Sequence, residues 1–98
     1  MKITHKIEDI DFEWDKDKAD ANLENHEVSF SEASEVFFDP FVHHTEPREE
    51  KGETRDAAIG LTKKWRLLYV AYAWRKLVIR LISARKATKA ERKKYENQ

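Results

Sequence analysis

Residues 57–83, AAIGLTKKWRLLYVAYAWRKLVIRLIS, decide the fold of this chain. Their β-branched, aromatic and aliphatic residues predict three strands, over residues 57–62, 65–74 and 76–83. Apolar side chains fall on both faces of these strands, which indicates a sheet with helices on one face and another cover on the other face. The two short connections contain neither Asn-Gly nor Asp-Gly, so the sequence leaves the registers of the hairpins open.

A strand and a helix are predicted near the N-terminus. Apolar and acidic residues alternate over residues 9–14, and this period of two indicates a half-buried strand. Asp15 follows as an N-cap, because its carboxylate can accept from the free amides of the next turn. We therefore expect a helix over residues 16–26, with Ala19 and Leu23 facing inward.

Two capping motifs predict the remaining helices. The motif S-x-x-E at residues 29–32 indicates a second helix over residues 30–38. The pair Asp39-Pro40 stops it, because proline cannot continue a helix and restricts the residue before it. The motif T-x-x-E at residues 88–91 predicts a last helix from about Lys89.

The order of these elements is β-α-α-β-β-β-β-α, if residues 41–43 form a short strand. Tandem C-terminal strands favour an antiparallel meander with helices packed on it, so the sequence predicts one α+β domain over residues 1–98. Between the two halves lies a charged loop over residues 44–56. Thirteen residues are long for a loop in a compact domain, which indicates mobility or function.

Composition excludes several classes of protein. The chain has no cysteine, so neither a disulfide nor a thiolate metal site is possible. No stretch approaches the ~20 apolar residues of a membrane span, and the N-terminus lacks the apolar run of a signal peptide. We therefore expect a cytoplasmic protein. Adjacent His43 and His44 point opposite ways on an extended chain and no Gly-rich phosphate loop occurs, so we expect neither a metal nor another cofactor.

The overall neutrality of the chain hides a dipolar molecule. The whole chain holds 19 basic residues (Lys and Arg) and 19 acidic residues (Asp and Glu). Residues 1–60 contain 7 basic and 17 acidic residues, whereas residues 61–98 contain 12 basic and 2 acidic residues. A basic surface facing a phosphodiester backbone is the simplest use for the positive half. The alternative is a solvated charged face that only keeps the protein soluble.

Several motifs resemble the BrnT toxins of type II toxin–antitoxin systems, in collinear order over about residues 10–96. They are F-x-W-D-x-x-K-A-x-x-N at 12–22, H-x-V-S-F-x-E-A at 26–33, V-F-x-D at 36–39, E-x-R at 53–55, I-G at 59–60 and I-R-L-I-S-A-R-K-A-T at 79–88, with Glu91-Arg92 and Tyr95. The first and the longest of these runs are specific only when they occur together.

The resemblance implies a RelE-like fold, with an antiparallel sheet of four to five strands, two N-terminal helices packed on it and a short C-terminal helix. It also implies a ribonuclease that stops translation. The implied partner is a ribbon-helix-helix antitoxin, BrnA, which blocks the toxin and forms a complex with it that binds operator DNA.

This chain departs from the family pattern in three places. Glu27 stands where the family usually has Gly, and Glu is strained in the left-handed conformation that ends a helix. The turn near residues 75–76 lacks its usual Gly. Residues 1–9 form an extension without a counterpart in the pattern.

Cleavage of RNA by its own 2′-hydroxyl needs a base, cations that stabilise the phosphorane, and an acid, but no metal. Arg80 is the first candidate, because it alternates with Val78 and Ile82 and projects from the middle of an apolar strand. An arginine in that position needs an anion. The anion is either the RNA phosphate or an internal carboxylate such as that of Glu53.

Two further pairs are candidates at the strand ends. Arg85 and Lys86 either bind phosphate oxygens of the RNA or form a solvated turn. Arg55 and Glu53 lie two residues apart on one face of a strand. They form either a catalytic couple or a plain cross-strand ion pair.

Polar residues of the first helix are a third group. Lys18, Asn22 and His26 recur every four residues and line one helical face. Lys18 and Asn22 are candidate RNA contacts and His26 a candidate proton carrier, unless the face is simply exposed or His26 packs in the core. Tyr72, central in its strand, acts as an acid or a stacking platform, or belongs to the core.

These observations favour a metal-independent endoribonuclease toxin in which arginines hold the scissile phosphate and His26, Glu53 or Tyr72 moves protons. One alternative is a non-catalytic module whose basic end binds nucleic acid or an acidic antitoxin segment. Another is a purely structural partner of a ribbon-helix-helix protein.

Overall fold

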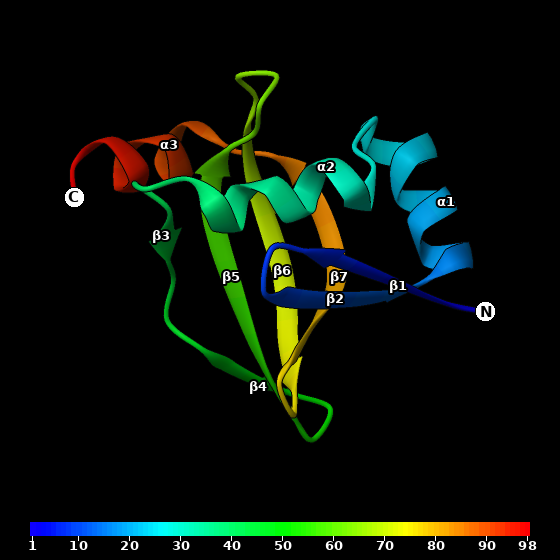
Figure 1. Cartoon of the computed structure of the whole chain (residues 1–98). Helices are drawn as coiled ribbons and strands as arrows, with labels where there is room; N and C mark the ends of the chain where they lie inside the picture. The colour runs from blue at the N-terminus through cyan, green and yellow to red at the C-terminus, as the bar shows by residue number, and fades with distance from the viewer.

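In the computed structural model, which describes residues 1–98, α2 and the 3-10 helix η1 lie across one face of a sheet (Figure 1). The elements in chain order are β1 (Lys2–Ile7), β2 (Ile10–Asp15), α1 (Lys16–His26), α2 (Phe30–Ser34), η1 (Glu35–Phe38), β3 (His43–His44), β4 (Arg48–Glu50), β5 (Glu53–Leu61), β6 (Leu67–Arg75), β7 (Val78–Lys86) and α3 (Lys89–Glu96). No helix combines the length and the apolar composition needed to cross a membrane.

The α+β class is confirmed, but the sheet is larger and its pairing more varied than predicted. It has seven strands in the order β1-β2-β7-β6-β5-β3, with β4 paired to β5 beside this path. β2 runs parallel to β7, whereas the other neighbours are antiparallel. A parallel pair needs a crossover connection, and the chain from α1 to β6 provides it.

Two strands lie where none was predicted. The first nine residues, which the motif pattern does not include, contain β1, and this strand pairs with β2 from Lys2↔Asp15 to Ile7↔Ile10. The segment predicted as a long charged loop contains β4 and the start of β5, which begins at Glu53 rather than at Ala57. β4 is fully exposed, so it leaves no pattern of hydrophobicity. β1 does alternate, with Ile3 and Ile7 packed against the core, and this signal was missed.

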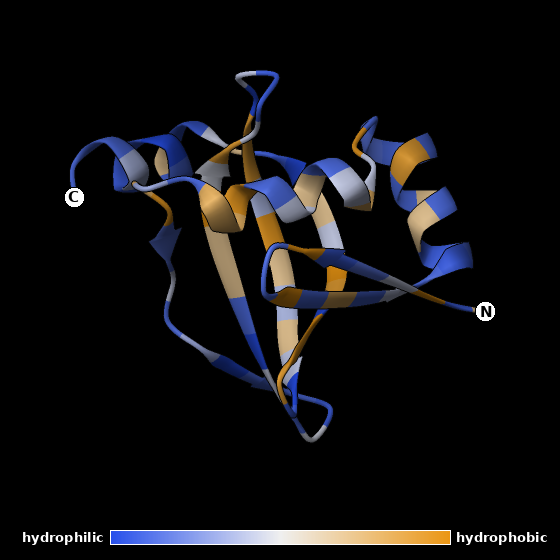
Figure 2. Cartoon of the chain, in the orientation of Figure 1, coloured by the Kyte–Doolittle hydropathy of each residue, from blue (hydrophilic) through white to orange (hydrophobic).

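The core lies between the sheet and the helices on its covered face. Thirteen buried residues form it, including Phe12, Phe30, Val36 and Leu68. In Figure 2 the hydrophobic segments follow the central strands and η1, whereas α3 and β4 are hydrophilic. Gly60 permits the close approach of η1 to β5, because a Cβ at this position would lie 2.9 Å from the Cβ of Val36.

The predicted N-caps are confirmed. The side chains of Asp15, Ser29 and Thr88 each accept a hydrogen bond from the backbone N–H three residues further on. The second helix is α-helical to Ser34 and continues as a 3-10 helix to Phe38, where the sequence predicts its end.

At the end of α1, Glu27 is strained and Leu23 does not face inward as predicted. Glu27 adopts the left-handed conformation, with φ 58° and ψ 32°, and its N–H donates to the carbonyl of Leu23. Glu therefore ends the helix as Gly would, at some cost in strain. Lys76 likewise has a positive φ, 59°, in the turn before β7. Leu23 was expected to face inward but is 51% exposed, and the buried residue of α1 is Asn22.

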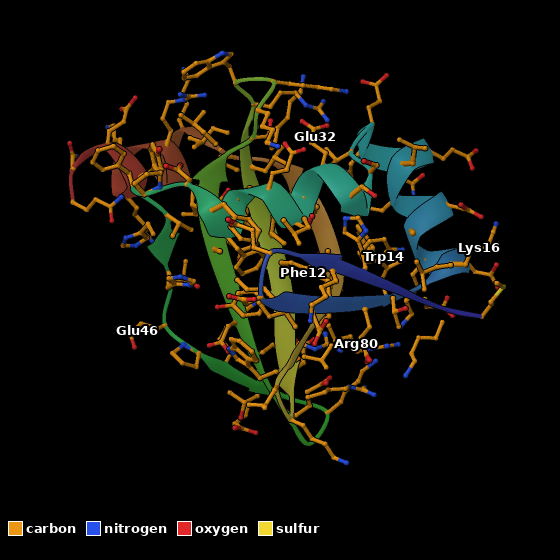
Figure 3. All side chains as sticks on the ribbon, in the orientation of Figure 1. Phe12, Trp14, Lys16, Glu32, Glu46 and Arg80 are labelled. Carbon is orange, nitrogen blue, oxygen red and sulfur yellow. The ribbon has the colours of Figure 1, made fainter.

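Glu32 holds the connection between β5 and β6 instead of closing the predicted capping box. Its carboxylate accepts hydrogen bonds from Arg66, at 2.7 and 2.9 Å, and from the Thr62 hydroxyl at 2.9 Å. Figure 3 shows Glu32 between α2 and this connection. The Arg66 guanidinium holds the pKa of the buried Glu32 carboxyl below its ordinary value.

We expect Glu32→Gln to make folding less sensitive to acid. Because the pKa of Glu32 is lower in the folded chain, its charge stabilises the fold above the ordinary pKa of 4.5, and this contribution is lost as the pH falls through the folded value. The measurement is the free energy of urea unfolding from about pH 6 to about pH 3. Wild type is expected to lose stability more steeply than the variant, and equal slopes would contradict the assignment.

Candidate active site

The face of the sheet away from α2 and η1 carries the candidate arginines. Side chains alternate along a strand, and directly paired residues of neighbouring strands share a face. Tyr69 pairs with Arg85, and Ala71 pairs with Ala57, which lies two residues after Arg55. These five residues therefore define one face, which we call the cationic face.

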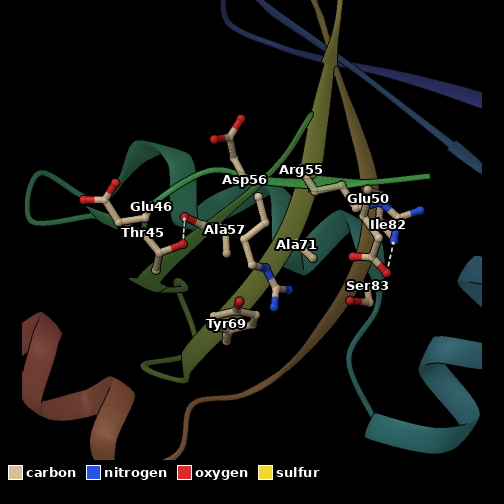
Figure 4. Close-up of a pocket in the computed structure, with 11 residues that line it drawn as sticks. Thr45, Glu46, Glu50, Arg55, Asp56, Ala57, Tyr69, Ala71, Ile82 and Ser83 are labelled. Carbon is tan, nitrogen blue, oxygen red and sulfur yellow. Dashed lines mark hydrogen bonds and ion pairs between the residues drawn. The ribbon is translucent and has the colours of Figure 1, made fainter. Parts of the chain in front are cut away.

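A pocket of about 240 Å³ opens on the cationic face (Figure 4). β5, β6 and β7 form its floor, and residues 45–50 form one wall. The N–H of Thr45 donates to the carbonyl of Ala57 at 2.9 Å and so holds this wall against the sheet. The lining is mostly polar and consists of Thr45, Glu46, Arg48, Glu50, Arg55, Asp56, Ala57, Tyr69, Ala71, Ile82 and Ser83.

Arg55 is a pocket cation with unused hydrogen-bonding capacity. Its Nε is buried without a hydrogen-bond partner. This atom lies 3.5 Å from Glu53 Oε2, and Nη1 lies 3.5 Å from Glu50 Oε1, both too long for strong hydrogen bonds. Figure 4 shows the Arg55 side chain reaching toward Glu50. Arg48 stands directly opposite Arg55 in the β4–β5 pair. Like charges in this position repel, so an anion in the pocket would stabilise both.

Tyr69 lines the pocket and supports a second arginine. The guanidinium carbon of Arg85 lies 4.3 Å from the centre of the Tyr69 ring. Both Nη atoms of Arg85 donate to the carboxylate of Glu91, at 2.8 and 2.9 Å. This bidentate pair raises the pKa of Arg85 and lowers that of Glu91. The guanidinium is thus fixed over the ring, while the side chain stays 37% exposed.

Arg80 lies on the cationic face but outside the pocket. Its Nη1 donates to Glu13 Oε2 at 3.2 Å, and Lys2 Nζ lies 3.5 Å from the other carboxylate oxygen. The suggested partner Glu53 is wrong, because the parallel pairing of β2 and β7 places Glu13 beside Arg80. Glu53 lies near Arg55 and, at 3.6 Å, near Arg75. Arg80 is therefore neutralised inside the protein.

Tyr72 lies on the covered face, so it does not meet the arginines. It is 4% exposed, and its ring packs edge-on against Phe37 at 4.9 Å. Its hydroxyl lies 3.0 Å from Nδ1 of His44. Burial raises the pKa of Tyr72 to about 12. Of the alternatives open from the sequence, the core position is the one that the structure supports.

The polar stripe of α1 is not a common surface. Asn22 is buried and makes three hydrogen bonds, from Nδ2 to the carbonyls of Val28 and Ala84 and to Oδ1 from the N–H of Ala84. Lys18 and His26 are exposed on the same helix, away from the pocket lining. An amide whose groups are all used inside the fold is not available to RNA.

Lys86 follows Arg85 directly, so the two side chains leave the strand in opposite directions and do not share a phosphate.

Several pocket residues were missed from the sequence. Tyr69 had a usable signal, because it shares a face with the small residues Ala71 and Ala73, which leave room above the strand. Arg48 had none, since its strand has no apolar pattern. No group of His, Asp or Glu converges to hold a metal ion.

The fold is similar to that of a ribonuclease toxin of known structure. In a crystal structure, the Brucella abortus ribonuclease toxin BrnT has a similar fold, with a TM-score of 0.57 and 20% sequence identity over 78% of this chain and 94% of that chain. At this identity the likeness shows the fold alone. No curated protein matches the sequence.

The fold and the polar pocket, whose lining includes Arg48 and Arg55, agree with a family assignment made from the sequence. Residues 14–91 match the family model described as the ribonuclease toxin, BrnT, of type II toxin-antitoxin systems. The class is therefore that of the ribonuclease toxins. Within this class the chain belongs to the BrnT family, which implies an RNA substrate and a cognate antitoxin.

Proposed function

We propose that this BrnT-family chain cleaves RNA without a metal ion, in the pocket on its cationic face. The observation that carries the proposal is Arg55, a guanidinium with a buried, unpartnered Nε that stands opposite Arg48 in a polar pocket. A phosphodiester would supply acceptors to both guanidinium groups and relieve their repulsion.

In the proposed reaction the 2′-oxygen of the RNA attacks the adjacent phosphorus, and the bond from phosphorus to the 5′-oxygen breaks. Glu50, which lines the pocket beside Arg55, accepts the 2′-proton. Arg55 and Arg48 stabilise the charge that develops on the phosphorane. Tyr69 donates its proton to the leaving 5′-oxygen. The products are a 2′,3′-cyclic phosphate and a 5′-hydroxyl.

Other candidates from the sequence take supporting roles in this proposal. Glu53 positions Arg55, because its Oε2 lies 3.5 Å from Nε. Arg85, fixed over Tyr69, binds the next phosphate along the RNA. Arg80 acts only at the margin of the surface, because Glu13 already neutralises it.

We also propose that the cognate antitoxin is a BrnA-like ribbon-helix-helix protein that covers the cationic face and binds operator DNA within the complex. The family assignment supports this partner. An acidic segment of the antitoxin would satisfy the same guanidinium groups as the RNA and so block cleavage.

Cleavage is expected to continue at an unchanged rate in excess EDTA. The measurement uses purified protein with structured and unstructured RNA, and end-group analysis of the products. The 3′-terminal fragments should begin with a 5′-hydroxyl, and the others should end in a cyclic phosphate. Activity that EDTA abolishes and Mg²⁺ restores would contradict the proposed chemistry.

A second candidate is a non-catalytic nucleic-acid-binding module. The observation that favours it is that none of the predicted proton carriers, His26, Glu53 and Tyr72, lines the pocket. It predicts intact RNA that is retarded in a gel, with binding that weakens steeply as salt rises.

A further inference from the structure

The connection between β5 and β6 presents an exposed tryptophan in a strained conformation. It projects beyond the end of the sheet, at the top of the view in Figure 1. Trp65 is 82% exposed and has a φ of 62°, a left-handed conformation that bulky residues rarely adopt. Neither the exposure nor the strain stabilises the fold. Positive φ values also occur at Lys51 and Lys76 in the other tight turns, so the turn accounts for the backbone of Trp65. The exposure of the ring is the feature that packing within the chain leaves unexplained.

The connection is rigid although its tip is exposed. The N–H of Thr62 donates to the carbonyl of Arg66 at 3.0 Å, and the N–H of Trp65 donates to the carbonyl of Thr62 at 3.0 Å. The Thr62 hydroxyl also accepts from two backbone amides of the loop. From below, the buried Glu32 binds both Thr62 and Arg66. The backbone that carries the indole is thus held in place before any partner arrives.

The charges beside Trp65 indicate which partner it meets. Lys63 and Lys64 precede it and are exposed, and Arg66 follows it, so its chain neighbours are cations rather than apolar residues. A flat aromatic ring between cations is the arrangement that binds single-stranded nucleic acid, with a base on the ring and phosphates on the lysines. A docking site for an apolar protein surface would instead need a contiguous apolar patch.

The loop also lies within reach of the pocket. Tyr69, which lines the pocket, follows Trp65 by four residues on the same run of chain, on the order of 13 Å when extended. Arg85 lies over Tyr69, so it stands at the end of the pocket that is nearer to the loop along β6.

We propose that Trp65, with Lys63 and Lys64, is a second RNA-binding site that stacks one unpaired base of the RNA whose backbone enters the pocket. The inference rests on the proposed function only in that the polymer is RNA. Arg55 would hold the cleaved phosphate, and the loop would hold the strand a few nucleotides away. This contact sets affinity and a preference for single-stranded over paired RNA.

The test is equilibrium binding of a 2′-O-methyl RNA oligonucleotide, which cannot be cleaved. Trp65→Asn removes the ring but tolerates the left-handed conformation, so the variant folds and its Tm is expected not to fall. Its affinity is expected to drop about 10-fold, the scale of one base–aromatic stack. Trp65→Phe should recover part of this loss, and RNA should quench the indole fluorescence of wild type more than that of Trp65→Asn.

A matched control is available at the other end of the sheet. Trp74 is also exposed, at 54%, and lies near the turn between β6 and β7. Trp74→Asn is expected to bind the oligonucleotide with unchanged affinity. Equal affinities of wild type and Trp65→Asn would overturn the inference, whatever the pocket does. Undiminished cleavage by an Arg55→Ala variant would instead overturn the proposed function, and the fluorescence measurement would still decide the role of Trp65.

Discussion

Arg55→Ala is expected to lower the rate of RNA cleavage by about 10²–10³-fold, the usual cost of losing one group that stabilises transition-state charge. The unpartnered Nε of Arg55 and its place opposite Arg48 make it the group with most to gain from a phosphorane. The rate should be measured under single-turnover conditions, so that the chemical step is observed. Arg55→Lys should recover little, because an ammonium group cannot form two parallel hydrogen bonds.

Arg75→Ala is the control for this variant. Arg75 and Arg55 both lie near Glu53, so either substitution leaves that carboxylate with one partner fewer. Arg75 is 55% exposed and does not line the pocket. The control is therefore expected to cleave RNA like wild type. Similar losses in both variants would show that the effect passes through Glu53, and the direct role of Arg55 would be withdrawn.

Local signals in the sequence predicted the elements that depend on local chemistry. The N-caps at Asp15, Ser29 and Thr88 are examples, because a cap is a contact between residues three positions apart. The parallel pairing that brings Glu13 to Arg80 joins residues 67 positions apart. An alternating pattern gives the face of a side chain but not the neighbouring strand. For this reason the suggested partner of Arg80 was wrong.

The candidate site was predictable only in part, for a related reason. Tyr69 and Tyr72 belong to one strand, which has apolar residues on both faces. Because they are three residues apart, their side chains lie on opposite faces of that strand. The sequence does not show which face the helices cover, so the central tyrosine was chosen and the pocket tyrosine was missed. Arg55 and Arg85 were found because each stands at an end of a predicted strand, which is a local feature of the sequence. Arg48 acquires its position only through pairing with β5.

Asn22→Ala is expected to produce the largest loss of stability among single substitutions outside the apolar core. β2 pairs with β7 only at residues 78–80, so the outer side of β7 has no strand beside Ala84. The Asn22 amide takes the place of that strand, since it accepts from the N–H of Ala84 at 3.0 Å and donates to its carbonyl at 2.9 Å. It also donates to Val28 at 2.9 Å, which joins α1, β7 and the start of α2.

Alanine would leave three buried backbone groups without partners, which should lower the free energy of unfolding by about 2–4 kcal/mol. For a chain of this size the corresponding fall in Tm is on the order of 10–20 °C. Asn25→Ala is the control on the same helix, because Asn25 is exposed, and its effect should stay within about 0.5 kcal/mol. Equal stabilities of the two variants would contradict the structural role. The rate of RNA cleavage per folded molecule, measured at low temperature, separates this structural role from the predicted RNA contact. Loss of an RNA contact would lower that rate, whereas loss of stability alone would not.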